Sequence, residues 1–87
     1  MSYRLLYERR FIRDLMVVPP SERDGIRSRL EWLAENATTI GHTPLREPRF
    51  KGVFRLRIGR WRIFYQIDHK QERIIILCII DRKEAYR

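Results

Sequence analysis

Seven consecutive apolar residues, Ile74–Ile80, constrain the fold of this chain more than any other feature. The run is rich in β-branched side chains, and it lies between the polar segment 68–72 and Asp81. A run of this kind is typical of a central strand that is covered on both faces of a sheet. It is too short to span a bilayer. Nothing at the N-terminus resembles a signal peptide, and the single cysteine allows no internal disulfide, so we expect a cytoplasmic protein that does not bind a membrane.

Two further strands are predicted before this run, because apolar and polar residues alternate there. In 53–58 the residues Arg55 and Arg57 share one face, and in 61–68 the residue Arg62 lies opposite the aromatic face. Gly59-Arg60 predicts a tight hairpin turn between the two strands. The hairpin therefore brings the three arginines to one face of a sheet, where we expect a phosphate-binding surface, the alternative being the solvated face of an ordinary sheet. We interpret the aromatic side chains Trp61, Phe64 and Tyr65 as packing residues.

The first part of the chain predicts one short strand, 3–8, and two helices. A helix over 9–17 has an apolar face made of Phe11, Ile12, Leu15 and Met16, and Pro19-Pro20 ends it. Ser21 is the expected N-cap of a second helix that runs to about residue 37. Its buried stripe consists of Ile26, Leu30, Leu33 and Ala37. A loop, 38–51, then leads to the strands.

These elements predict one α+β domain over residues 1–87, in the order β-α-α-β-β-β. A helical hairpin packs on one face of a mainly antiparallel four-stranded sheet, and a short polar tail, 81–87, follows the last strand. The other face of the sheet can then be open.

Charge narrows the class of partner. The net charge is +8, sixteen of the nineteen cationic residues are arginine, and residues 46–87 hold twelve cations against five anions. An excess of this kind in one half of a chain favours a polyanionic partner. Because a guanidinium binds phosphate in a bidentate manner and stacks on bases, we expect nucleic acid to be that partner.

Several kinds of site are not indicated. The sequence has no glycine-rich nucleotide-binding motif. His42 and His69 fall in separate predicted loops without zinc-type spacing, and we interpret both as surface histidines. Cys78 lies inside the apolar run and is interpreted as a core residue. If the chain is an enzyme, we expect it to use neither a metal nor an organic cofactor.

The hairpin Val53-Phe-Arg-Leu-Arg-Ile-Gly-Arg-Trp-Arg-Ile-Phe-Tyr-Gln-Ile67 and the tail Ile80-Asp-Arg-Lys-Glu-Ala-Tyr-Arg87 resemble the RelE branch of the RelE/ParE toxin superfamily. The start of the chain, Tyr3-Arg-Leu-Leu-Tyr-Glu8, is similar too. The resemblance implies the toxin of a type II toxin-antitoxin system. RelE-type members cut mRNA in the ribosomal A site, inhibit translation, and are silenced by a cognate antitoxin.

Carried over by position, the resemblance implies catalytic roles for Arg57, Arg62, Arg82 and Tyr86. Better-known relatives have lysines in place of Arg55 and Arg57, and many have a histidine in place of Asp81. Both departures remove a group that could take a proton near neutral pH. An arginine is a poor general base, which leaves Tyr86 as the base or as a stacking platform, with Asp81 and Glu84 as weaker candidates. The RNA-binding set is then Arg46, Arg49, Lys51, Arg55, Arg60 and Lys83.

Three alternatives remain open at this stage. The chain could be a ParE-type poison of DNA gyrase, or a nucleic-acid-binding member without catalysis. Arg62 could also be structural and pair with a carboxylate. The partners implied by the resemblance are the ribosome, mRNA and a RelB-like antitoxin in a hetero-oligomer. We expect the antitoxin to lay an amphipathic, acid-bearing segment along the sheet or the helical hairpin.

Overall fold

The computed structural model describes residues 2–85, which form one mixed sheet with the two longer helices on one side. In chain order the elements are β1 (Arg4–Tyr7), α1 (Arg9–Leu15), α2 (Pro20–Glu35), β2 (Thr43–Pro44), the 3-10 helix η1 (Pro48–Phe50), β3 (Phe54–Ile58), β4 (Trp61–Asp68), β5 (Arg73–Asp81) and α3 (Arg82–Ala85). None of the helices in this part of the chain is long and apolar enough to cross a membrane.

The predicted α+β fold with a mainly antiparallel sheet is confirmed, with one correction to the number of strands. The sheet has five strands in the order β1-β5-β4-β3-β2; β1 runs parallel to β5, and the other three pairings are antiparallel. The additional strand is β2, in which Thr43 pairs with Arg55. A strand of two residues is too short to show alternation, which is why the predicted loop over 38–51 concealed it. As predicted, β5 is a central strand.

The register of the sheet decides which side chains share a face. Ile58 pairs with Trp61 across the turn at Gly59, whose φ is +56°, and this pairing sets Arg57 opposite Arg62. Between β4 and β5 the register shifts at Phe64/Tyr65. Alternation places Arg55, Arg57, Arg62 and Phe64 on one face, away from the helices.

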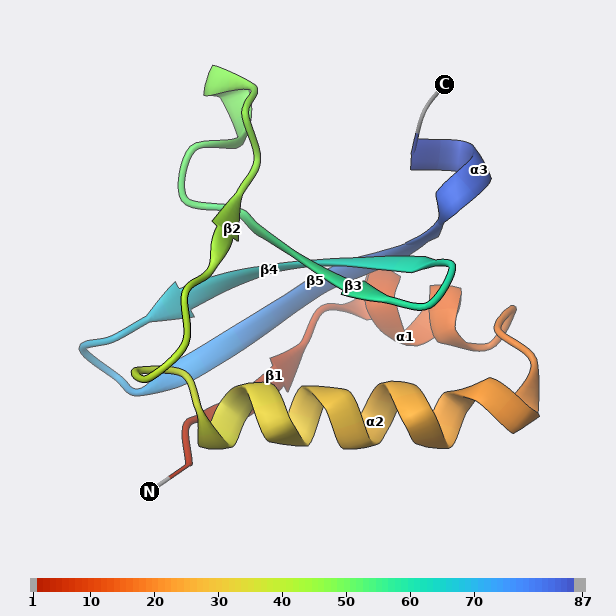
Figure 1. Ribbon diagram of the computed structural model, residues 1–87, viewed down its shortest axis with the longest axis horizontal. Coiled ribbons are helices and arrows are strands. Elements are labelled where there is room, and N and C mark those ends of the chain that lie inside the picture. The colour runs from red at the N-terminus through yellow and green to blue at the C-terminus, as the bar shows by residue number, and fades with distance from the viewer. Residues whose placement is uncertain (1, 86–87) are drawn as a thin grey trace.

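The other face of the sheet carries the core. Figure 1 shows α1 and α2 on this side, while the segment holding β2 and η1 and the helix α3 rise from the opposite side. Because each helix buries one apolar stripe against the sheet, the two layers share one cluster. Its buried members are Phe11, Val18, Ile26, Leu30, Leu33, Ala37, Trp61, Ile63, Tyr65, Ile74, Ile76 and Ile79.

Two details of the predicted helices are wrong. Ile12 and Met16 are 54% and 68% exposed, because only the side of α1 that carries Phe11 is buried against the rest of the core. The N-cap of α2 is Pro19, and Ser21 lies inside the helix, since Pro20 already occupies its first turn. A proline suits that position because the first N–H groups of a helix have no partner within it.

His42 also differs from its prediction as a surface histidine. Its side chain is half-buried, and its Nδ1 and Nε2 lie 2.7 Å from the Tyr65 hydroxyl and 2.8 Å from the carbonyl oxygen of Ala37. His42 therefore ties the end of the helical layer to β4. His69 is exposed as predicted, with its Nδ1 2.8 Å from the hydroxyl of Tyr3.

Candidate nucleic-acid interface

A groove of about 790 Å³ lies on the face of the sheet that the helices leave open. Phe64 from β4 and Cys78 and Ile80 from β5 supply apolar side chains to it. Arg10 lines it on the β5 side, and Arg46 follows β2 on the other side. We call this cavity the sheet groove. Its apolar surface with cationic residues around it suits a ligand that is both apolar and anionic.

Arg55, Arg57 and Arg62 bring positive charge to this face, as the sequence predicts. Arg55 and Arg57 are exposed, whereas Arg62 is 3% exposed and donates from Nη1 to the carbonyl oxygen of Trp61 at 3.5 Å. None of the three forms an ion pair with another residue in the described range 2–85. Guanidinium groups stay protonated throughout the physiological range. The charges of Arg55 and Arg57 are therefore available to an anion that enters from solvent, whereas Arg62 is almost entirely buried.

The three arginines line two adjoining cavities. Arg55 and Arg62 line the sheet groove and also a smaller cleft of about 400 Å³, which Arg57 lines as well. This smaller cleft, called here the β3-edge cleft, lies between β3 and α2. The predicted cationic surface is thus divided, with Arg57 directed to the β3-edge cleft.

The basic cluster before β3 lies at the margin of the sheet groove. Arg46 lines the groove, while Arg49 pairs with Glu47 at 2.8 Å and places its guanidinium 4.9 Å from the centre of the Phe50 ring. Lys51 is exposed and does not line either cavity. Of the three predicted cations, only Arg46 therefore lines the sheet groove.

Arg60 and Asp81 fix the start of α3. The Arg60 Nε lies 3.5 Å from Asp81 Oδ2. The carbonyl oxygen of Arg60 accepts a 2.7 Å hydrogen bond from the Arg82 N–H. Asp81 Oδ1 accepts the backbone N–H of Lys83 at 3.2 Å. The guanidinium of Arg60 also lies 4.6 Å from the centre of the Trp61 ring. Arg60 is thus already engaged by the protein, and Asp81 has the position of a capping residue.

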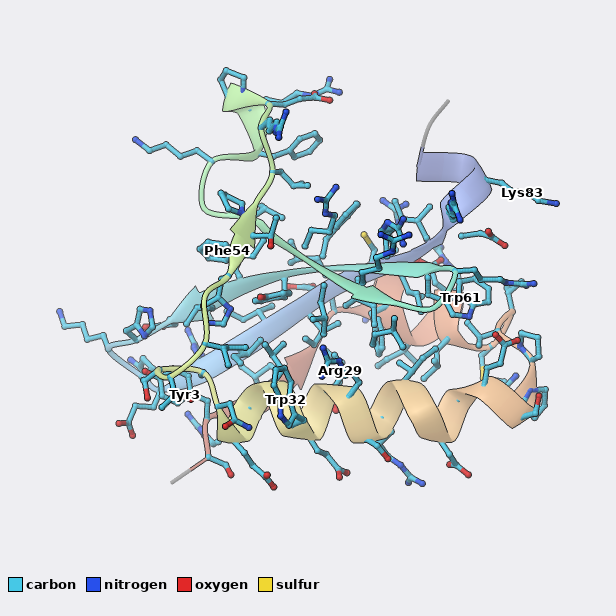
Figure 2. The ribbon with its side chains drawn as sticks, in the orientation of Figure 1. Tyr3, Arg29, Trp32, Phe54, Trp61 and Lys83 are labelled. Carbon is cyan, nitrogen blue, oxygen red and sulfur yellow. The ribbon has the colours of Figure 1, made fainter. Side chains whose placement is uncertain are left out.

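The structure describes only some of the remaining predicted residues of the tail. Arg82 is exposed at the start of α3, and Figure 2 shows the Lys83 side chain pointing away from the sheet. The structure does not bring Lys83 to the sheet groove. Tyr86 and the side chain of Glu84 lie outside the described residues.

The aromatic and sulfur groups of this region behave as packing residues. Trp61 and Tyr65 are buried as predicted, and the Trp61 Nε1–H donates to Glu22 Oε1 at 3.1 Å. Burial raises the pKa of the Cys78 thiol, which keeps it protonated and unreactive near neutral pH. Phe64 is only half-buried, and its ring forms part of the sheet groove.

Sequence reasoning missed three contributors to these cavities, namely Arg10, Arg29 and Trp32. Arg10 comes from α1 and the other two from α2. All three lie in helical segments whose pattern shows only which face is buried. Their approach to the strands depends on how the helices pack, and no local motif indicates it.

A model of the family described as "ParE toxin of type II toxin-antitoxin system, parDE" matches residues 5–86. The chain belongs to this toxin family. A Methanocaldococcus jannaschii protein assigned as toxin RelE1 is 32% identical to it, with 100% of this chain and 98% of that protein aligned. The predicted membership in the RelE/ParE toxin superfamily is confirmed, and the chain is a type II toxin.

Solved structures of the family have the same fold. The toxin-antitoxin complex RelBE2 from Mycobacterium tuberculosis contains a chain that matches with a TM-score of 0.82 and 25% identity, covering 94% of this chain and 93% of that one. The isolated RelE toxin of E. coli matches with a TM-score of 0.76 over 98% of this chain and 92% of its own. At 17% identity, that likeness concerns the fold alone.

Proposed function

We propose that this toxin is a ribosome-dependent endoribonuclease that cleaves mRNA and inhibits translation. The observation that carries the proposal is the placement of Arg55, Arg57 and Arg62 on one sheet face, without carboxylate partners among residues 2–85. Three fixed cations on neighbouring strands suit the charge that develops on a phosphodiester under attack. The name of the M. jannaschii relative, a RelE toxin, agrees with this activity class.

The reaction is transesterification within the RNA. The 2′-oxygen attacks the adjacent phosphorus and forms a new O–P bond, while the bond from phosphorus to the 5′-oxygen breaks. The 2′-hydroxyl proton passes to a base, and the leaving 5′-oxygen takes up a proton, which gives a 2′,3′-cyclic phosphate and a 5′-hydroxyl. Arg57 and Arg62 stabilise the negative charge on the phosphorane oxygens, and Arg55 holds the substrate.

The tail supplies the remaining groups. Arg82 follows β5 directly and is a candidate for binding the scissile phosphate or the leaving oxygen. Tyr86 is the candidate base or stacking platform. Asp81 is a weaker base, because both of its oxygens already have partners in Arg60 and Lys83. Such a site is feeble on free RNA and depends on the ribosome to align the substrate.

An antitoxin of the RelB type neutralises this toxin. The M. tuberculosis and E. coli relatives occur as RelBE toxin-antitoxin complexes, and the sheet groove offers an amphipathic acidic helix both an apolar surface and cations. A segment seated there would cover Arg55 and Arg62. Inhibition then follows from exclusion of the RNA.

The proposal is tested by mapping cleavage on a translated message by primer extension. Wild type should produce cuts only when the message is being translated, and Arg62→Ala and Tyr86→Phe should each slow cleavage about 100-fold or more. Arg13→Ala is the matched control, because Arg13 is exposed on α1 and lines neither cavity. Intact message in the presence of wild-type toxin would refute the nuclease. Equal losses of cleavage and of ribosome binding in the variants would refute the catalytic roles.

One other activity has a specific observation in its favour. The matching family model describes ParE toxins, and this sheet can equally carry a DNA gyrase poison. The same extract, supplied with gyrase and supercoiled plasmid, separates the two activities. Gyrase-linked DNA breaks with intact mRNA would identify the poison.

A further inference from the structure

One side of the β3-edge cleft is lined by residues that have no role in the proposed cleavage chemistry. Arg29 and Trp32 from α2 line it opposite β3, which contributes Arg55 and Arg57. Figure 2 shows the side chains of Arg29 and Trp32 next to each other on α2. The two residues come from a helix and the other two from a strand, so the cleft exists only in the folded molecule.

The cleft is strongly cationic. Four of its lining residues are arginines, and no acidic residue of the described range 2–85 lines it. Like the three strand arginines, Arg29 has no ion pair with another residue in that range. Guanidinium groups gathered in this way repel one another until an anion is bound. The cleft therefore favours a ligand with more than one negative charge.

Trp32 adds an aromatic surface to the cationic cleft. The Arg29 guanidinium carbon lies 4.1 Å from the centre of the Trp32 ring, and Trp32 is still 36% exposed. An exposed indole in the lining of a cationic cleft is the combination by which proteins bind unpaired bases together with their phosphates. At about 400 Å³ the cleft accommodates roughly one nucleotide and not a duplex.

The cleft also adjoins the proposed cleavage site, because Arg55 and Arg62 line both cavities. A strand that places a phosphate at Arg62 can therefore continue over the edge of β3 toward α2. An acidic protein segment is the competing occupant, since Leu56–Ile58 has no strand partner on that edge among the described residues. Pairing with that edge would leave the Arg29 and Trp32 side chains without a role, which favours the nucleic acid.

We propose that the β3-edge cleft binds single-stranded RNA next to the cleaved phosphate, with Trp32 stacking on one base and Arg29 contacting a neighbouring phosphate. The identity of the ligand rests on the proposed function. Arg29 and Trp32 contribute to affinity and positioning, and they take no part in breaking the bond. An RNA strand long enough to reach both cavities gains affinity that a shorter strand does not.

The test uses 2′-O-methyl oligouridylates of three and eight nucleotides, which cannot be cleaved, and measures binding by fluorescence anisotropy. Wild type should bind the eight-mer more tightly than the three-mer. Trp32→Ala and Arg29→Ala should each weaken eight-mer binding about tenfold and leave three-mer binding nearly unchanged. In Arg29→Ala the slope of log affinity against log salt should fall by about 0.7, the value for one lost phosphate contact on a single strand.

Arg27→Ala is the matched control, because Arg27 lies on the same helix, is exposed, and pairs with Asp24 outside the cleft. Trp32→Phe keeps a stacking ring and should retain most of the affinity. Circular dichroism shows whether Trp32→Ala folds. If it does not, Trp32→Phe tests the stacking, because the RNA-induced quenching of tryptophan emission should then be lost. Arg29→Gln then tests the phosphate contact through loss of affinity.

Three results are decisive. Eight-mer binding that is equal in wild type, Arg29→Ala and Trp32→Ala would overturn the proposal. Loss of binding to an oligoglutamate peptide in these variants, with RNA binding intact, would assign the cleft to a protein and also overturn it. Trp32-dependent binding of the eight-mer by a wild type that cuts no translated message would support the cleft and refute the nuclease separately.

Discussion

Arg57 and Arg62 lie directly opposite each other on β3 and β4, yet Arg57 is exposed and Arg62 is 3% exposed. Two like charges in a cross-strand pair destabilise a sheet, and burial of one of them adds a desolvation cost. Within the described range, Arg62 has one weak hydrogen bond to a carbonyl oxygen and no ion pair. The sheet thus holds a charge at a position where stability alone favours an apolar residue.

Arg62→Leu should therefore separate stability from activity. Because leucine removes both the repulsion and the desolvation cost, we expect the free energy of unfolding to stay the same or rise by about 1 kcal/mol. Cleavage of translated mRNA should fall about 100-fold or more. Urea titrations and primer extension measure the two effects. A variant that is both less stable and fully active would show that Arg62 is a structural residue.

Asp81→Ala should weaken the attachment of α3 to the β3–β4 turn. The substitution removes the ion pair with Arg60 and the acceptor for the Lys83 N–H, which together are worth about 1 kcal/mol. We expect faster hydrogen exchange at residues 82–83 and a lower rate of cleavage. Asp81→Asn keeps a capping oxygen and should restore most of both. If Asp81 were the general base, Asn would be as inactive as Ala.

Tyr65 makes folding sensitive to alkaline pH. Burial raises the pKa of its phenol from 10.0 to about 12, so the folded state holds the proton more tightly than the unfolded state does. The contribution of the protonated Tyr65 to the free energy of unfolding is fully present below pH 10. It is lost as the pH rises to 12, and this loss is on the order of 2 kcal/mol.

Tyr65→Phe should flatten this dependence between pH 10 and 12. It should also cost about 1 kcal/mol at neutral pH, because His42 loses its hydrogen-bond partner. Chemical denaturation at several pH values checks both effects. Tyr7, whose pKa is also raised, first by burial and then by Glu31, contributes equally to both proteins and cancels in the difference. An unchanged pH slope would contradict the prediction.

Phe64→Ser should distinguish the antitoxin from the RNA. The half-buried ring contributes apolar surface to the sheet groove, which an amphipathic helix needs and a phosphate chain does not. We expect binding of the cognate antitoxin to weaken about tenfold or more, measured by calorimetry, with little change in the affinity for oligouridylate. Phe64→Leu is the control. Parallel losses for both ligands would mean that the variant disturbs the whole face.

The part of the site that the sequence predicts is the part built by one hairpin. A period of two fixes the faces of β3 and β4, and a two-residue turn at Gly59 fixes their register, so Arg55, Arg57 and Arg62 could be placed together in advance. The β3-edge cleft could not be predicted in this way. Arg29 and Trp32 reach it because α2 packs across the sheet, and sequence periodicity does not give the position of a helix over a sheet.

The fold, like the site, is predictable only in part from the sequence. The periodicity of the long helices and strands predicts that they exist and of which type they are, whereas β2 and α3 are too short to show a periodic pattern. Helical spacing made Ile12 and Met16 members of a buried face, but it could not tell how much of that face the sheet would cover. Nor does any local pattern show that β1 pairs in parallel with β5.

That parallel pairing has a consequence for biosynthesis. Among the described strands, β1 is made first and pairs with β5, which is made last. Long-range pairing of this sort delays folding until both partners are present. The nascent chain cannot pair β1 with β5 before residue 81 has been added, so the sheet stays incomplete for most of the time that the polypeptide is being made.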